Sequence, residues 1–265
     1  MRKAVVIAVF VGLLSVAAWA QQGGQEEIAV KLTPSALGTT TCSSTYSSGF
    51  EDSFFQWCVT ANGNIAQFAS PNEDIRAGAI LEGYQICDVT PNVGYFDYAS
   101  TDSGNWKAAS LIQPNGVNTF PITVKRTTSD NHFILTQKFT QDVANRTVTV
   151  SMTIKNNTTA QHNVLVYRFA DLDINGTFTN TFDNGVDSAW GYSPGTFGLQ
   201  LALQTVDFGN AAKKYNLATG GALKACASPA DPDGPVTEDG AVYIKVLVPL
   251  AAKASDTVVF NYRAM

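Results

Sequence analysis

Hydrophobic and polar residues alternate along much of the chain with a period of two, which is typical of β-strands. The clearest run is residues 146–155, "RTVTVSMTIK". Its apolar side chains share one face and its hydroxyl side chains share the other, namely Val148, Val150, Met152 and Ile154 against Thr147, Thr149, Ser151 and Thr153. A strand of this kind suits an antiparallel sheet with one buried face and one solvated face.

Similar runs predict a chain built mainly from strands. Runs at 120–127, 132–140 and 162–174 flank the first one, and the short turn-rich segments between them predict a meander. Further strands are expected at 53–60, 64–69, 79–89, 198–206, 241–249 and 256–264. No segment has the period of a long amphipathic helix. The pattern therefore predicts an all-β fold, as a large antiparallel two-sheet β-sandwich or super-sandwich.

The N-terminus has the organisation of a secretory signal peptide. Two cations, Arg2 and Lys3, precede an apolar run at 4–17, and Ala18-Trp19-Ala20 offers the small-x-small pattern of a cleavage site. Cleavage after Ala20 predicts a secreted or periplasmic protein. No later run reaches the 18 consecutive apolar residues expected of a transmembrane helix.

The rest of the chain is expected to form one domain. Residues 1–20 are the signal peptide, residues 21–50 are a flexible N-terminal segment with a Ser/Thr-rich loop, and residues 51–265 are a single β-sandwich domain. The formal net charge is −5, and loss of the two signal-peptide cations makes it −7. Such an acidic chain is a poor partner for nucleic acid or for an anionic membrane surface.

Four cysteines predict two disulfides, because an exported chain meets an oxidising environment. They are Cys42, Cys58, Cys87 and Cys226, and three pairings are open. Cys42–Cys58 with Cys87–Cys226 is favoured, since the first bond closes the Ser/Thr-rich loop. A zinc site is the alternative, but the chain contains no C-x-x-C motif.

The segment "ADLDINGTF", residues 170–178, allows two interpretations. Its D-x-D-x-N-G order resembles the start of an EF-hand loop, but the twelfth position is Phe182 rather than an acid. Asn-Gly is also the strongest two-residue hairpin signal, and a hairpin here would pair Asp171 with Asn180. Asp171 and Asp173 would then share a face with Asn180, so calcium is a candidate cofactor at these three residues.

Residues 94–107, "GYFDYASTDSGNWK", place aromatic rings beside acids and amides. Rings with polar tips can form a platform on which a sugar stacks, and the candidate ligand-binding residues are Tyr95, Asp97, Tyr98 and Trp106. The simpler interpretation, which we prefer, is a loop whose rings fold back onto the sandwich.

Three segments carry a resemblance to known proteins: "EGYQICD", "IKNNTTAQHNVLVYRFADLD" and "GYFDYASTDSGNW". They resemble uncharacterised exported bacterial β-proteins that have E-G-Y-x-x-C-D and R-x-A-D-x-D strands, a group that implies no activity. The long Thr-rich meander is more distantly similar to carbohydrate-active super-sandwiches of the galactose-mutarotase type. That likeness is at the level of the fold, because the histidine pair and acid of those enzymes cannot be placed here.

The sequence does not establish an activity, and it favours a binding or structural role over catalysis. The expected partner is a carbohydrate or another cell-surface component. The first alternative is a carbohydrate-active enzyme that uses acids at strand ends, such as Glu82 and Asp88. The second is a self-assembling surface subunit whose residues 21–32 add a strand to a neighbouring copy.

Overall fold

The computed structural model describes residues 41–71, 73–75, 82–195, 198–204, 210–216, 226 and 232–265. All of them belong to one compact unit, Lys31–Met265. The predicted signal peptide, its cleavage site and residues 21–40 lie outside the described residues. Among the described residues, no helix has both the length and the apolar character needed to cross a membrane.

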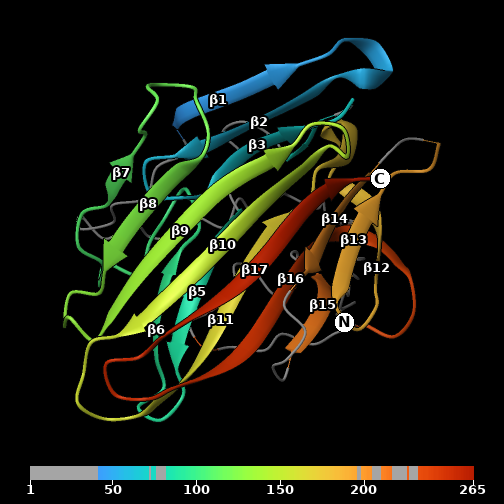
Figure 1. Cartoon of the computed structure of the whole chain (residues 1–265). Helices are drawn as coiled ribbons and strands as arrows, with labels where there is room; N and C mark the ends of the chain where they lie inside the picture. The colour runs from blue at the N-terminus through green and yellow to red at the C-terminus, as the bar shows by residue number, and fades with distance from the viewer. Residues whose placement is uncertain are drawn as a thin grey trace, which may run out of the picture. The chain divides into compact units, whose positions relative to one another are not determined.

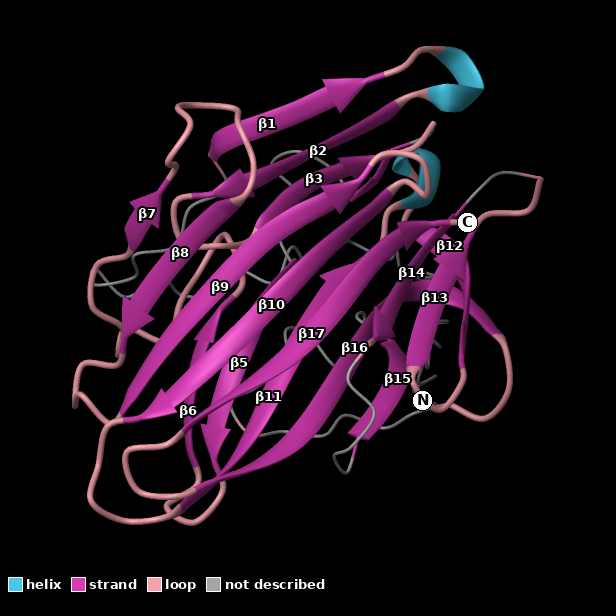
Figure 2. Ribbon diagram, in the orientation of Figure 1, coloured by secondary structure: helices cyan, strands magenta, loops and turns pink. Residues whose placement is uncertain are grey.

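The described part of the chain consists of strands, two short 3₁₀ helices and the loops between them (Figure 2). In chain order the elements are β1 (Cys42–Ser48), η1 (Glu51–Ser53), β2 (Phe55–Thr60), β3 (Ile65–Ala69), β4 (Glu73–Ile75), β5 (Glu82–Asp88), β6 (Val93–Asp97), β7 (Ser110–Ile112), β8 (Ile122–Thr127), β9 (Phe133–Asp142), β10 (Thr147–Asn156), β11 (His162–Asp171), η2 (Ile174–Gly176), β12 (Thr179–Asn184), β13 (Ser188–Tyr192), β14 (Gly198–Leu203), β15 (Asn210–Asn216), β16 (Val236–Leu250) and β17 (Ser255–Ala264).

The strands form a 4-stranded sheet, β1-β2-β3-β4, and a 13-stranded sheet. The larger sheet folds into two layers that share β16, since residues 241–250 of β16 pair with β11 and residues 236–239 pair with β12. We call β6-β5-β11-β16, with β15 on β16, the back layer, and β12-β13-β14-β17-β10-β9-β8-β7 the front layer (Figure 1). The predicted all-β sandwich is confirmed.

One hydrophobic core fills the space between the sheets. The inward face of β10 is the predicted one, and its four apolar side chains have no exposed surface: Val148, Val150, Met152 and Ile154. They belong to the same cluster as Val164 and Val166 of β11 and as Phe55 and Trp57 of β2. Burial of apolar surface at about 25 cal/mol per Å² is the main force that holds such layers together.

The predicted meander is correct for three strands and wrong for the fourth. β8, β9 and β10 pair in chain order, but β11 enters the back layer, where it lies between β5 and β16. The physical reason is that β11 is apolar on both faces. Val164 and Val166 face the main core, whereas Tyr167 and Phe169 belong to a second buried cluster with Tyr98 and Tyr243. A strand with two apolar faces is stable only in a layer that is covered on both sides, and the back layer is covered on both sides at β11.

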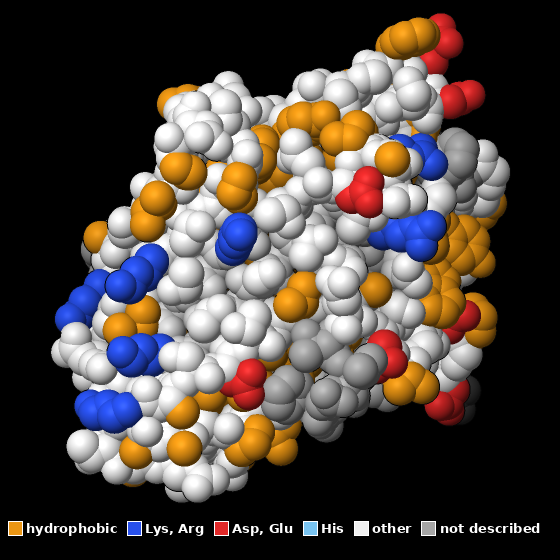
Figure 3. Space-filling model, viewed as in Figure 1, with side chains coloured by type: hydrophobic (Ala, Val, Ile, Leu, Met, Phe, Trp, Pro, Cys, Tyr) orange, Lys and Arg blue, Asp and Glu red, His pale blue; other side chains and the backbone are white. Residues whose placement is uncertain are grey.

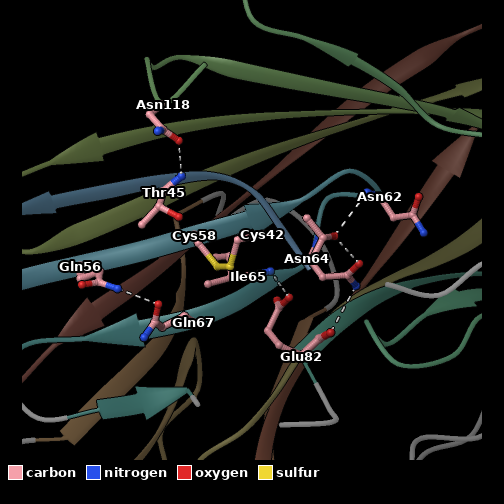
Figure 4. The surroundings of a disulfide bond; sticks show 11 residues. Cys42, Thr45, Gln56, Cys58, Asn62, Asn64, Ile65, Gln67, Glu82 and Asn118 are labelled. Atoms are coloured by element: carbon pink, nitrogen blue, oxygen red, sulfur yellow. Dashed lines mark hydrogen bonds between the residues drawn. A yellow bond between two sulfur atoms is a disulfide. The ribbon is translucent and has the colours of Figure 1, made fainter. Parts of the chain in front are cut away.

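The Ser/Thr-rich segment expected to be a loop contains β1, which pairs with β2. Both strands are tied by the Cys42–Cys58 disulfide, and the Thr45 amide donates a hydrogen bond to Asn118 across to the β7–β8 loop (Figure 4). Tyr46 packs against Phe120, with ring centroids 6.1 Å apart. Thr and Tyr favour strands when a neighbouring sheet covers them, which composition alone does not reveal.

The second disulfide, Cys87–Cys226, joins β5 to a residue 139 positions later in the chain. Both predicted pairings are therefore present, and the described residues include no free cysteine. Cys87 lies in the second buried cluster, and Cys226 packs against it.

The predicted hairpin at Asn175-Gly176 is wrong in its pairing and right in its backbone conformation. Both residues have positive φ, 57° and 71°, as a tight turn of this type requires. However, β11 and β12 do not pair with each other, because β16 lies between them. The segment crosses from one layer to the other, and Leu172 and Ile174 bury their side chains in the core as it does so.

Candidate functional site

The four residues of the expected sugar platform are buried, which corrects the prediction of an exposed binding loop. Their exposed fractions are 2%, 0%, 1% and 3% for Tyr95, Asp97, Tyr98 and Trp106. The Trp106 indole donates a hydrogen bond to the Phe96 carbonyl, and the Tyr98 hydroxyl donates one to Gln85. The rings fold back onto the sandwich, as in the interpretation preferred above, and a sugar cannot stack on rings that solvent does not reach.

Asp97 belongs to a buried ionic network instead. Arg126 on β8 donates hydrogen bonds to Asp97 Oδ2 at 2.5 Å and to Asp102 Oδ2 at 3.1 Å. The Arg126 guanidinium also lies 5.0 Å from the centre of the Trp106 ring. Burial raises the pKa of Asp97 to about 7, while the Arg126 guanidinium acts in the opposite direction. The network holds the 94–107 segment against the front layer.

A second buried network surrounds Arg168 on β11. Its guanidinium donates hydrogen bonds to Glu82 at 2.6 Å, to Gln137 at 2.7 Å and to the Tyr262 hydroxyl at 2.9 Å. Burial raises the pKa of Glu82, although the Arg168 charge favours the ionised carboxylate. Since Glu82 and Arg168 lie in the back layer while Gln137 and Tyr262 lie in the front layer, this network connects the two layers.

Neither of the strand-end acids considered for hydrolysis faces solvent. Glu82 is 1% exposed, and its second oxygen accepts the Ile65 amide hydrogen bond (Figure 4). Asp88 is fully buried and lies 2.6 Å from Nδ1 of His162. A glycosidase needs two carboxyl groups that flank a bound sugar, which these two side chains cannot do from inside the sandwich.

The three candidate calcium ligands lie near the end of β11, but their environments differ. Asn180 is buried, and its amide donates hydrogen bonds to the carbonyls of Leu172 and Thr177, so this side chain holds the crossover segment. Burial raises the pKa of Asp171, and so do the charges of Asp173 and Asp239. Among the described residues, no group of three or more His, Cys, Asp or Glu is arranged to hold a metal ion. Calcium binding stays a prediction.

A shallow polar groove of about 470 Å³ lies on the solvent-facing side of the front layer. It is lined from four neighbouring strands, β14, β17, β10 and β9, and from two adjoining loops by Asp142, Asn145, Thr147, Thr149, Gln200, Ala202, Gln204, Asn261 and Arg263. Figure 3 views this side of the molecule, and the middle of it carries few charged or hydrophobic side chains. Planar amides, hydroxyls and one ion of each sign make a surface suited to hydrogen bonding.

The strand register arranges the lining side chains in rows across the sheet. Gln200 of β14 is opposite Arg263 of β17, which is opposite Thr147 of β10, which is opposite Asp142 of β9. In the next row Ala202, Asn261 and Thr149 are opposite one another, and Thr149 donates a 2.8 Å hydrogen bond to Asn261. Such facing residues have Cβ atoms about 5 Å apart, so each row offers closely spaced polar groups.

Two aromatic side chains lie next to the groove on β13. Trp190 is opposite Gln200, and Tyr192 is opposite Gly198, on the same solvent-facing side of the sheet. Tyr192 is 36% exposed. The row that begins at Asp183 and runs through Trp190 and Gln200 to Asp142 crosses six strands. At about 4.8 Å per strand it extends for roughly 24 Å.

Sequence reasoning predicted the strands that carry this groove but missed the groove itself. The alternation in "GLQLALQ" and "FNYRA" already separates Gln200 and Gln204, or Asn261 and Arg263, from buried neighbours. What the sequence does not reveal is that β14 pairs with β17 and β17 with β10. The second of these pairings brings together Thr149 and Asn261, which are 112 positions apart in the chain.

Comparison with known proteins places the fold but no family. No protein-family description matches the chain, and no curated protein does. Among solved structures, a bacterial glucoamylase in complex with acarbose is similar over 86% of this chain and 33% of its own, with a TM-score of 0.59 and 7% identity. A polysaccharide lyase (TM-score 0.44, 11% identity, 88% of this chain and 31% of its own) also matches. So does a kojibiose phosphorylase described as putative, from the human microbiome (TM-score 0.39, 7% identity, 87% and 30%). The chain spans about a third of the length of each.

Proposed function

We propose that this chain is an exported carbohydrate-binding protein and that the polar groove on the front layer is its binding site. The observation that carries the proposal is the pair of residue rows in the groove. Sugars present adjacent hydroxyl groups, and planar amide, carboxylate and guanidinium side chains at fixed spacing are well suited to bind them. Trp190 and Tyr192 next to the groove add apolar ring surface of the kind that packs against a sugar ring.

The fold is consistent with this proposal. The glucoamylase is a carbohydrate-active enzyme, and its likeness to this chain supports a carbohydrate-related sandwich without transferring an activity. The two disulfides are of the kind that persist in an oxidising compartment, which agrees with an exported protein.

The number of carboxylates in the groove lining favours binding without turnover over hydrolysis. The groove lining contains one carboxylate, Asp142, and its two oxygens accept hydrogen bonds from the amide and side chain of Asn145. These bonds lower the pKa of Asp142, so this group is an anion at neutral pH. A glycosidase requires a second carboxyl group about 5–10 Å away, and the described lining of the groove offers none.

A glycan array followed by calorimetry tests the proposal. The mature protein should bind a subset of glycans without releasing reducing ends, and Asn261→Ala and Gln200→Ala should each weaken binding roughly tenfold. Thr153→Ala on the same face of β10 is the matched control, since Thr153 bonds Thr257 outside the groove and should leave affinity unchanged. Equal loss from the control, or no binding to any glycan, would contradict the proposal, and release of reducing ends would favour the enzyme alternative.

A further inference from the structure

The guanidinium of Arg263 lines the groove and has no ion-pair or hydrogen-bond partner among the described residues. The other described arginines have partners: Arg126 and Arg168 bond buried carboxylates, and Arg146 bonds the Asp52 carbonyl and Ser70. Arg263 is exposed, and none of the ion pairs or side-chain hydrogen bonds among the described residues involves it. A guanidinium offers five N–H donors in a planar fork, so an oxyanion is the ligand that it fits best.

Two amide side chains next to Arg263, those of Gln200 and Asn261, have NH₂ groups that make no hydrogen bond among the described residues. Asn261 accepts a hydrogen bond from Thr149 through Oδ1. Its NH₂ group can therefore donate to a ligand. The side-chain amide of Gln200, directly opposite Arg263, has no hydrogen-bond partner among the described residues. The only carboxylate in the groove lining, Asp142, is separated from Arg263 by Thr147 and bonded to Asn145. The groove lining therefore places no carboxylate directly beside Arg263, and it has neighbouring amide groups that can donate to a second oxygen.

The charge of the surrounding face has the opposite sign to that of the chain. The net charge is −5. Yet the solvent-facing positions of β8, β9, β10 and β17 carry one acid, Asp142, and four cations, namely Lys125, Lys138, Lys155 and Arg263. In Figure 3, Lys and Arg side chains are visible in one group at the left of this face and in a second group at its upper right. The three lysines lie outside the groove lining, so they supply only long-range attraction for an anionic ligand.

We infer that the groove selects glycans that carry carboxylates, and that Arg263 binds the carboxylate of a uronic acid residue. The inference rests on the proposed carbohydrate function and names its ligand class. Two parallel N–H···O bonds from Arg263 engage the carboxylate, with the amides of Gln200 and Asn261 beside it for ring hydroxyls. Lys125, Lys138 and Lys155 contribute to long-range attraction and make no specific contact.

The experiment compares oligogalacturonate with its carboxyl-reduced counterpart of the same length, in calorimetry at 150 mM salt. The mature wild-type protein should prefer the acidic oligomer by roughly tenfold or more, the size expected of a charge-assisted bidentate contact. Arg263→Gln should abolish the preference, because it should weaken binding of the acidic oligomer roughly tenfold more than binding of the reduced oligomer. Arg263→Lys should keep part of it, because the ammonium retains the charge and loses the fork.

Lys155→Gln is the matched control, because it removes one cation from the same face outside the groove. Its preference for the acidic oligomer should equal that of the wild type. Equal affinity of the wild type for both oligomers would overturn the inference and leave the carbohydrate function standing. Binding of neither oligomer nor any arrayed glycan would remove the proposed function as well. Tight binding of dextran sulfate, weakened equally by Lys155→Gln and Arg263→Gln, would show general attraction of polyanions and also overturn the assignment to Arg263.

Discussion

Single side chains decide where polar groups can function in this molecule. Asp97 and Glu82 are candidate functional residues in the sequence. In the structure they form buried ion pairs with Arg126 and Arg168. Removing one partner of such a pair costs about 3–5 kcal/mol, because an uncompensated charge stays buried. Gly83 lies where two backbone segments approach closely. A Cβ at this position would lie 2.0 Å from the Asp97 carbonyl oxygen, so the glycine of "EGYQICD" permits a close strand contact.

Asp171 is the carboxylate for which a pH effect is most clearly expected. Its pKa is raised by burial and by the charges of Asp173 and Asp239. A raised pKa in the folded state means that stability is full at low pH and is lost as the pH rises through the folded-state pKa. Asp171→Asn removes the charge, so it should raise the melting temperature by roughly a few degrees at pH 7.5 and by much less at pH 4. Differential scanning calorimetry at both pH values measures this.

The exposed Asp233, in the loop before β16, provides the control for this prediction. Asp233→Asn should change the melting temperature little at either pH. A lower melting temperature of Asp171→Asn at pH 7.5 would contradict the prediction. The same scans with added calcium also test the calcium hypothesis, since stabilisation of the wild type and not of Asp171→Asn would identify this carboxylate as a calcium ligand.

At the scale of elements, the sequence predicts where the strands lie better than it predicts which strands pair with each other. The one-sided pattern of β10 located its core face correctly, and the runs at β14, β16 and β17 lie where they were expected. The turn at Asn175-Gly176 has the predicted positive φ values, yet the strands on its two sides belong to different layers. Local residues specify a backbone conformation, whereas the insertion of β16 between β11 and β12 depends on segments some 60 residues away.

The candidate site could be predicted only in part, for the same reason. The polar alternation of β14 and β17 is visible in the sequence, but the adjacency of Gln200, Arg263 and Thr147 follows from long-range pairing. The aromatic cluster at 94–107 was a misleading signal, because it is accounted for by the packing of β6 and Trp106 on the core. A segment with aromatic and acidic residues has the same composition whether it forms an exposed binding loop or a buried part of the core, so composition alone does not distinguish the two.

The disulfides give a prediction about the elements that they connect. Cys87–Cys226 closes a loop of 139 residues, whereas Cys42–Cys58 closes one of 16. The loss of chain entropy in the unfolded state predicts about 5 kcal/mol of stabilisation for the longer loop and about 3 kcal/mol for the shorter one. Urea unfolding of Cys87→Ala/Cys226→Ala and of Cys42→Ala/Cys58→Ala should therefore rank the first variant as the less stable. The reverse order would show that the Cys42–Cys58 bond contributes to the native packing of β1 beyond loop closure.

At the scale of the whole described unit, the two layers and the smaller sheet share their stabilising contacts. β16 contributes residues to both layers, and one hydrophobic cluster includes Trp57 of the smaller sheet, Val150 of the front layer and Ile244 of the back layer. The Arg168 network crosses the same space and bonds residues from four strands. Few of these contacts can be lost without exposing the rest of the core, so the sheets are expected to unfold together.

Cooperative unfolding can be tested with the tryptophans as local reporters. Trp57, Trp106 and Trp190 lie on β2, in the 94–107 segment and on β13, respectively. In protein labelled with 5-fluorotryptophan, their three ¹⁹F resonances should lose native intensity at the same urea concentration. Ile244→Ala, which opens a cavity in the shared hydrophobic cluster at a cost of about 2–5 kcal/mol, should lower all three midpoints equally. A Trp57 midpoint that stays unchanged while the Trp190 midpoint falls would mean that the smaller sheet is stable without the larger one. The shared core would then not be the source of cooperativity.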